Sequence, residues 1–397
     1  MKILVSNIGS TSFKFRLFDM GAGEAELSAG GADRIGSAGG KLTWSVAGGE
    51  RRKLARDFAD HGEAITLVLD RLVADGALSE TGELDAVAFK AVMGGDCDPV
   101  ALVDDELLAT MEYFNPVAPA HNPPYVAAMR TFREVLGATP LVAAFEPGFH
   151  RTNPPRRRRY ACPPAWADDF GVKRYGFHGA SHRYIATRLA ELMPRASRAI
   201  SCHLGGSSSL CAIRDGRSVA TSMGLSPQSG LPQGSRVGDF DPYGLKLMAA
   251  RTGRGLDDLL AELGGRSGLA ALSGTSGDMR DVEQGAADGD EPCRRAIDIY
   301  VTAIRDYLGA YLVELGGVDA IAFTGGIGQR SPLVRARALE GLGFAGIALD
   351  AEANAATMDE GRIDAAGSSA AVWVLSTNEE LIVARQAAEL LGRRGGT

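Results

Sequence analysis

The stretch KILVSNIGSTSFKFRLF, residues 2–18, places two apolar segments on either side of a short turn of glycine and hydroxyl residues. Residues 199–213, AISCHLGGSSSLCAI, repeat this design about half a chain further on. Each copy has an apolar strand, a polar residue (Asn7 or His203), a glycine, a hydroxyl-rich turn and a second strand. A hairpin that recurs at this separation predicts a duplicated α/β domain.

The turns of the two hairpins suit phosphate binding. Glycine lets the backbone approach a ligand closely, and clustered amides and hydroxyls form a concave array of donors. A single turn of this kind more often has no role beyond reversing the chain. Two copies favour a pair of turns that both face one polyphosphate. Residues 319–334, DAIAFTGGIGQRSPLV, add a strand that ends in glycines before a helix, as at nucleotide crevices in α/β proteins. The chain has no GxxxxGK pattern, which argues against a P-loop protein.

Composition narrows the class of protein. A chain of 397 residues predicts two domains, and 45% hydrophobic with 23% charged residues is typical of a globular protein. The net charge of −7 disfavours nucleic acid and anionic membranes as partners, so we expect small-molecule partners. The apolar run at the start is short, and no apolar stretch of about 18 residues follows. We therefore expect a cytoplasmic protein.

The pattern of apolar residues predicts alternating helices and strands. Helical spacing runs through residues 64–73, 184–192, 296–315 and 381–391, and buried strands are expected at 87–89, 141–145 and 372–375. Residues 21–51 are interpreted as surface hairpins. The five scattered cysteines are expected to be reduced core residues, and the arginines at 156–159 to form a solvated basic patch.

Further motifs resemble those of acetate kinase and its short-chain carboxylate kinase relatives. They are APAHNPPY (118–125), AAFEPGFHRTNP (143–154), YGFHGASHRY (175–184), TSMGLSPQSGLPQGSRVGDFDP (221–242), SGTSGDMRDV (273–282) and STNEELIVAR (376–385). Together with the hairpins they extend the resemblance over nearly the whole chain. The combination of YGFHG and HNPP is far more specific for this family than any glycine turn.

The resemblance implies the duplicated actin-like ATPase fold, of the ribonuclease H-like class, with two α/β domains around a central cleft. It implies a homodimer that reversibly transfers the γ-phosphoryl group of ATP, with Mg²⁺, to a short-chain carboxylate, by direct in-line transfer. The products are an acyl phosphate and ADP. We expect an N-terminal domain of residues 1–147 plus 381–397 on the substrate and phosphoryl side. Residues 148–380 are expected to bind the nucleotide and to dimerise.

The same resemblance implies roles for individual residues. The catalytic residues would be His178, Arg236, Glu146 and Asn7, and the metal ligands Asn7 and Glu379. The substrate would contact Lys90, Val92, Ala120, His121, Phe177 and Pro227. ATP would contact Ser10, Ser12, Lys14, His203, Gly205, Gly206, Asp278, Met279, Arg280, Gly326, Ile327 and Gly328.

Structural alternatives stay open for several of these residues. Arg236 could be a surface arginine, and Asp278 with Arg280 could be a surface pair. His121 or His203 could be a structural histidine, and Ser12 only a turn hydroxyl. His178 and His182 have the spacing of a zinc site, although no third ligand is evident and we favour hydrogen bonding. Ser376 and Glu379 also have the spacing of a capping box that starts the last helix.

Departures from the family pattern cluster at the substrate. Lys90 stands in FKAVMGG where the family has a carboxylate-binding arginine, Glu146 replaces an aspartate, and Ala120 replaces a leucine beside the acetyl methyl. Changes at Gly206-Ser207 and Gln329-Arg330 affect the nucleotide loops. The hypothesis is therefore a relative with a larger acyl substrate, such as propionate, or reduced activity.

Two alternative functions remain from the sequence. One is a kinase of the same fold with another carboxylate or with pyrophosphate as donor. The other is a nucleotide-binding relative with weakened catalysis. Retention of Asn7, His178, Arg236 and Glu379 argues against the latter.

Overall fold

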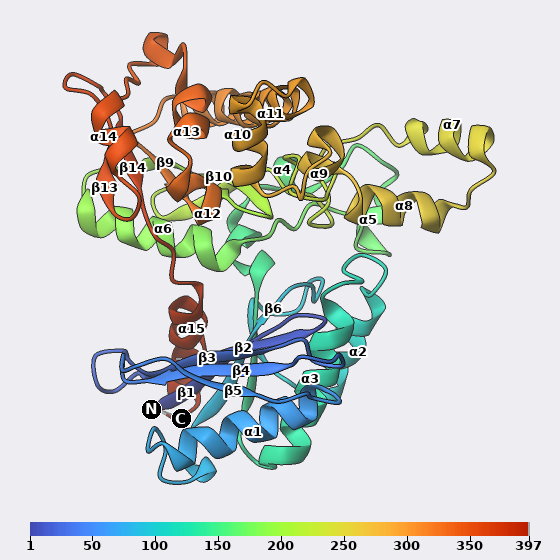
Figure 1. Cartoon of the computed structure of the whole chain (residues 1–397), viewed down its shortest axis with the longest axis vertical. Helices are drawn as coiled ribbons and strands as arrows, with labels where there is room; N and C mark the ends of the chain where they lie inside the picture. The colour runs from blue at the N-terminus through green and yellow to red at the C-terminus, as the bar shows by residue number, and fades with distance from the viewer. Residues whose placement is uncertain (396–397) are drawn as a thin grey trace. The chain divides into compact units, whose positions relative to one another are not determined.

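The computed structural model describes residues 1–395, and the chain divides into two compact units. One unit is Met1–Gly148 together with Asn378–Thr397, and the other is Phe149–Thr377. Residues 396–397, the end of the expected N-terminal domain, lie outside the described residues. Each unit is built on one sheet, and the ribbon of each can be followed in Figure 1.

The N-terminal unit has an eight-stranded sheet in the order β5-β4-β3-β2-β1-β6-β8-β7. Its strands are β1 (Lys2–Ile8), β2 (Ser12–Asp19), β3 (Ala25–Asp33), β4 (Lys41–Val46), β5 (Arg52–Ala55), β6 (Ala86–Ala91), β7 (Val100–Leu102) and β8 (Leu141–Phe145). Its helices are α1 (His61–Ala74), α2 (Asp105–Tyr113), α3 (Asn122–Leu136) and α15 (Glu379–Gly395), with a 3-10 turn at Thr81–Glu83.

Alternating side chains of these strands pack on helices at both faces of the sheet. Ile3 and Val5 of β1 share one apolar cluster with Val383 of α15. On the other face, Phe132 of α3 makes edge contacts with Phe13 and Phe89, at centroid distances of 6.0 and 5.4 Å. Strands β1, β6 and β8 therefore have α15 on one face and α3 on the other.

The C-terminal unit has a six-stranded sheet in the order β11-β10-β9-β12-β14-β13. Its strands are β9 (Arg198–Leu204), β10 (Ser208–Arg214), β11 (Arg217–Thr221), β12 (Ala320–Thr324), β13 (Gly361–Arg362) and β14 (Ala371–Val374). Its helices are α4 (Pro155–Arg158), α5 (Pro164–Asp168), α6 (Gly179–Leu192), α7 (Tyr243–Thr252), α8 (Leu256–Gly265), α9 (Gly268–Ser273), α10 (Met279–Ala287), α11 (Glu291–Leu315), α12 (Gly325–Arg330), α13 (Pro332–Leu339) and α14 (Ala351–Ala356); 3-10 turns lie at Glu146–Thr152, which spans the boundary between the units, and at Leu342–Ala345.

Helix α11 covers one face of this second sheet and α6 the other. Leu308 of α11 belongs to the same apolar cluster as Leu210 and Phe323. Ile185 of α6 packs in a separate cluster with Cys211 and Ala322. The alternation of side chains along β10 and β12 therefore divides their residues between two helical layers.

The two sheets share one topology. In the order β3-β2-β1-β6-β8, the first two pairings are antiparallel and the next two parallel. The order β11-β10-β9-β12-β14 repeats those directions strand for strand. This repetition confirms the prediction of a duplicated α/β fold.

Several sequence predictions need correction. Residues 21–51 do form hairpins, but β3 and β4 extend the main sheet and Trp44 is buried in it. Cys97 and Cys162 are only half-buried, unlike the three core cysteines. The arginine run is not simply solvated, because Arg156 and Arg157 pair with Glu314 at 2.8 and 2.5 Å. Among the described residues, no helix has the length and apolar character needed to cross a membrane.

Candidate functional site

A cavity of about 360 Å³ in the C-terminal unit brings together three glycine-containing segments. Its lining comprises Gly205, Gly206, Gly277, Asp278, Met279, Arg280, Glu283, Gly326, Ile327, Arg330 and Ser331. Seven of the residues predicted to contact ATP are in this lining: Gly205, Gly206, Asp278, Met279, Arg280, Gly326 and Ile327. Segments more than 100 residues apart in sequence thus form one concave site.

Glycine is required where two of these segments meet. Gly325 starts α12 with φ +77°, and a Cβ there would lie 2.5 Å from the Leu204 carbonyl oxygen at the end of β9. Side chains are therefore excluded by both backbone conformation and space. By contrast, a Cβ at Gly206 or Gly326 would meet no atom within 4 Å, so these two glycines face open space beside the cavity.

Asp278 and Arg280 form an exposed ion pair that also caps a helix beside the cavity. Asp278 precedes α10, and its carboxylate accepts a hydrogen bond of 2.9 Å from the Arg280 backbone NH. The Arg280 guanidinium donates to the same carboxylate at 2.9 and 2.6 Å. These bonds from Arg280 lower the pKa of the Asp278 carboxyl to about 2. The pair is a cap that fixes one rim of the cavity in its ionised form.

Gly328 and His203 are outside the cavity lining. Gly328 is buried behind it, where its carbonyl oxygen accepts from Arg335 Nη1 at 2.9 Å. Arg335 is fully buried and also donates to the carbonyl oxygens of Gln329, Asn354 and Thr357. The sequence analysis missed this arginine, which holds the end of α12 in place.

The second hairpin positions the catalytic candidates of this unit. Ser209 Oγ lies 2.7 Å from His178 Nδ1, and the His178 ring stacks on His203 at 4.2 Å between centroids. Ser181 Oγ lies 2.8 Å from His203 Nδ1. His178 itself is not inside a helix but precedes α6 with a left-handed φ of 56°. The two imidazoles are thus fixed against the hairpin that also supplies Gly205.

His182 has a supporting position rather than a place in a metal site. It is fully buried, with Nδ1 2.9 Å from Ser201 Oγ and Nε2 2.9 Å from Ser209 Oγ. Burial, with the neighbouring imidazoles of His150 and His203, holds its pKa well below the usual value. Among residues 1–395, no group of three or more His, Cys, Asp or Glu side chains is arranged to hold a metal ion.

The buried histidines predict acid sensitivity. Burial lowers the pKa of His150 from 6.5 to about 4. Between these values the unfolded chain binds a proton that the folded chain does not, so stability falls as the pH falls. Between pH 7 and pH 4, the unaltered protein should lose about 3 kcal/mol more unfolding free energy than the His150→Gln variant. This follows because each unit of pKa difference is worth about 1.4 kcal/mol. Urea unfolding of both proteins across this range measures the slope, and equal slopes would contradict the expectation.

Arg236 lies next to the same hairpin. Its Nη1 donates to Ser207 Oγ at 3.2 Å and to Gln233 Oε1 at 3.0 Å, and Ser207 Oγ is 2.7 Å from Gln233 Oε1. The side chain is half-buried, and burial lowers the pKa of its guanidinium. Both acceptors are neutral, so the positive charge is held in place without being neutralised by them. This geometry is unlike that of a surface arginine.

The N-terminal unit gathers a second cluster of charged residues. Lys90 Nζ lies 2.6 Å from Glu379 Oε2. Burial alone would lower the pKa of Lys90, but the charges of Glu379 and Glu146 outweigh it and raise this pKa. Tyr125 donates its hydroxyl to Asn7 Oδ1 at 3.1 Å, and burial raises the pKa of Tyr125 to about 12. Tyr125 stands in the APAHNPPY motif, but sequence analysis gave it no role.

This cluster has the donor chemistry that Mg²⁺ prefers. Glu379 offers carboxylate oxygens and Asn7 an amide oxygen, which are hard ligands. Mg²⁺ usually takes one or two carboxylates together with water and substrate phosphates, so a full protein cage is not needed. The residues present therefore fit the metal role predicted for Asn7 and Glu379.

The first hairpin presents an exposed turn. Gly9 donates its NH to the Ser12 carbonyl at 2.8 Å, and a Cβ on Gly9 would lie 2.5 Å from Ser12 Oγ. Ser10 and Lys14 are exposed, and Lys14 pairs across the ladder with Asn7. Ser10 and Ser12 are therefore at the tip of the hairpin, whereas Lys14 lies further along β2.

The predicted substrate residues divide between the two units. Lys90, Val92, Ala120 and His121 belong to the N-terminal unit, and Phe177 and Pro227 to the C-terminal unit. Buried Asn122 fixes the first group, because its amide donates to the carbonyls of Met93 and Met111 at 2.9 and 2.8 Å. Sequence analysis missed Asn122, although it stands in the HNPP motif.

The capping-box interpretation of Ser376 is wrong. Helix α15 begins at Glu379, and Asn378 Oδ1 accepts from the Leu381 NH at 3.2 Å. Asn378 is therefore the residue that caps the helix. Ser376 Oγ instead accepts from Gln329 Nε2 at 2.8 Å.

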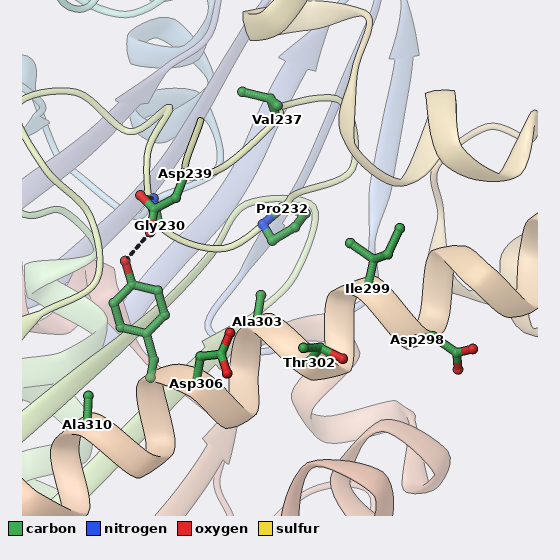
Figure 2. Close-up of a pocket in the computed structure, with 11 residues that line it drawn as sticks. Gly230, Pro232, Val237, Asp239, Asp298, Ile299, Thr302, Ala303, Asp306 and Ala310 are labelled. Atoms are coloured by element: carbon green, nitrogen blue, oxygen red, sulfur yellow. Dashed lines mark hydrogen bonds between the residues drawn. The ribbon is translucent and has the colours of Figure 1, made fainter. Parts of the chain in front are cut away.

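A larger cavity of about 590 Å³ lies along α11 (Figure 2). Asp239, Asp298 and Asp306 line it together with apolar side chains such as Ile299 and Val237. Tyr307 donates its hydroxyl to Asp239 at 2.6 Å. Carboxylates repel phosphate, and none of the predicted site residues lines this cavity, so it is not the nucleotide site.

Comparison with known proteins agrees with this fold. The model of the acetokinase family matches residues 2–385. Acetate kinase of Shouchella clausii is 37% identical over 393 residues, covering 98% of this chain and 99% of the relative. The crystal structure of Porphyromonas gingivalis acetate kinase has a TM-score of 0.89 at 32% identity, covering 98% and 99% of the two chains. The crystal structure of a propionate kinase from Francisella tularensis has a TM-score of 0.90 at 29% identity, covering 97% of this chain and 98% of that chain.

These findings define the class: a duplicated α/β protein of the actin-like ATPase fold. The chain belongs to the acetokinase family, which confirms the resemblance found in the sequence.

Proposed function

We propose that this protein phosphorylates a short-chain carboxylate with ATP and Mg²⁺, reversibly and by direct in-line transfer, to give an acyl phosphate and ADP. Membership of the acetokinase family makes it a phosphotransferase of the acetate kinase type, with a carboxyl group as acceptor. The finer points, namely the donor, the metal and the acid, are our inference from the site.

One observation carries the proposal: a single hairpin organises both a cavity and two polar catalytic candidates. Gly205 and Gly206 line the cavity, Ser207 holds Arg236 and Ser209 holds His178. Phosphoryl transfer needs mainly positioning and charge stabilisation, so a cation and a hydrogen-bond donor beside a glycine turn are suited to it. This arrangement favours a catalyst over a relative that only binds nucleotide.

We propose the following roles for these residues. The cavity of the C-terminal unit holds the nucleoside, and Arg236 and His178 stabilise charge on the transferring phosphoryl group. Lys90, Val92, Ala120 and His121 contribute the acid-binding side from the N-terminal unit. When bound through Asn7 and Glu379, Mg²⁺ neutralises phosphate charge.

The test is direct formation of acyl phosphate. Purified protein with ATP, Mg²⁺ and an acid is incubated with hydroxylamine, which traps the acyl phosphate as a coloured hydroxamate. Pyrophosphate replaces ATP in a parallel reaction. We expect product with ATP, and product from no acid with either donor would contradict the proposal.

The acid is expected to be larger than acetate. Ala120 occupies the place where the family has leucine beside the acetyl methyl, so room is left for an added methylene. One methylene in an apolar pocket is worth roughly tenfold in kcat/KM. We predict propionate to exceed acetate by about this factor, and Ala120→Leu to reverse the preference. Faster phosphorylation of acetate by the unaltered protein would contradict a larger pocket.

A homodimer through the C-terminal unit is also proposed. Helix α7 has no buried residue, and Tyr243, Leu247, Leu256 and Leu260 of α7 and α8 are 74%, 57%, 59% and 47% exposed. Figure 1 shows α7 and α8 extending from the sheet of their own unit. Apolar side chains gathered on a projecting helix pair suit a second copy of the chain. A cytoplasmic location stays a prediction.

A further inference from the structure

The ion pair between Lys90 and Glu379 joins two residues for which sequence analysis expected separate roles. Lys90 was expected to hold the substrate carboxylate, and Glu379 to bind the metal. Their side chains are 20% and 13% exposed, and the Lys90 ammonium lies 2.6 Å from Glu379 Oε2. The lysine thus pairs with a carboxylate of its own chain.

A lysine and a divalent cation compete for such a carboxylate. Both bind the same carboxylate oxygens, and two positive charges a few ångströms apart repel each other strongly where water is scarce. Glu146 adds a second negative charge that acts on Lys90. The lysine is therefore held by two negatively charged side chains of its own unit.

We infer that Lys90 is an internal counter-ion of Glu379 that a divalent cation displaces, and that the displaced lysine then binds the substrate carboxylate. This inference rests on the proposed function, because it takes Glu379 as a metal ligand. Lysine suits such an exchange because its ammonium is a point charge on a flexible stem, whereas the arginine of the family pattern is a planar fork.

The exchange couples two binding events. Metal binding frees Lys90 for the acid, so by reciprocity a bound acid strengthens metal binding by the same factor. Removing the lysine should abolish this coupling. It should also remove a competitor, so the metal binds more tightly.

The test measures Mn²⁺ binding to the full chain with ADP, from the electron paramagnetic resonance signal of free Mn²⁺. Lys90→Met keeps the length of the side chain and removes its charge. We expect its dissociation constant for Mn²⁺ to be roughly fivefold lower than that of the unaltered protein, and propionate to have no further effect on it. Glu379→Gln should weaken Mn²⁺ binding both in the otherwise unaltered protein and in the Lys90→Met variant.

Lys41→Met is the matched control, since Lys41 is a partly exposed lysine of the same unit that pairs with Asp33 at 3.7 Å. It removes the same charge and should leave Mn²⁺ binding unchanged. Circular dichroism verifies folding, and Lys90→Gln provides a second neutral variant. Mn²⁺ affinity in both Lys90 variants that is equal to or weaker than that of the unaltered protein would overturn the inference. If the unaltered protein still forms acyl phosphate, only the exchange is wrong; if it does not, the proposed function fails as well.

Discussion

Replacement of Arg236 by alanine is expected to lower kcat by about 10³-fold or more, with little change in ADP binding. A positioned arginine that stabilises charge in phosphoryl transfer is worth about 10³ to 10⁵ in rate. Arg236 is suited to this role because Ser207 and Gln233, which hold it, are neutral. The hydroxamate assay measures the rate, and calorimetry with ADP measures binding.

Two variants sharpen this experiment. Arg236→Lys keeps the charge but loses the fork, and should retain part of the lost activity. Arg266→Ala removes a 69% exposed arginine of the same unit and should leave kcat unchanged. A kcat for Arg236→Ala within tenfold of that of the unaltered protein would show that the arginine is structural.

Replacement of His178 by asparagine is expected to lower kcat by about 10² to 10³-fold, the usual cost of losing one donor to a developing negative charge. Asparagine is the informative choice, because His178 has a φ of 56° and asparagine adopts this left-handed region readily. The shorter side chain removes the imidazole without straining the start of α6. The rate is measured with saturating ATP and acid.

The same variant separates catalysis from folding. Its thermal unfolding midpoint should be close to that of the unaltered protein, since the backbone conformation is kept. Ser209→Ala removes the contacts at His178 Nδ1 and His182 Nε2 and should give a smaller loss of kcat, with an altered pH profile of the rate. If His178→Asn unfolds at the usual temperature and turns over at the usual rate, His178 has no catalytic role.

The local motifs made the fold predictable. Both hairpins are antiparallel pairs in the structure, Lys2–Ile8 with Ser12–Asp19 and Arg198–Leu204 with Ser208–Arg214, because turn and strands are contiguous in sequence. The strand at Leu141–Phe145 was predicted with its observed bounds. The start of a helix was harder to predict. Helix α15 begins after Asn378, whereas the capping prediction chose Ser376, two residues earlier.

The site was predictable as a set of residues but not as a network. Nothing in the sequence pairs Lys90 with Glu379, which are 289 residues apart. From the sequence, Ser207 was a change in a nucleotide loop and Ser209 part of a hydroxyl-rich turn, but the structure gives them different partners, Arg236 and His178. Such contacts depend on tertiary folding, and no periodicity or local motif encodes them.

The most direct test of the central claim runs the reaction backwards. Purified protein is mixed with Mg²⁺, ADP and propionyl phosphate or acetyl phosphate, and ATP is measured by luciferase luminescence. Reversible carboxylate kinase chemistry predicts that ATP forms in both reactions, faster from propionyl phosphate, and that Arg236→Ala forms almost none. Absence of ATP formation by the folded, unaltered protein from either acyl phosphate would contradict the account.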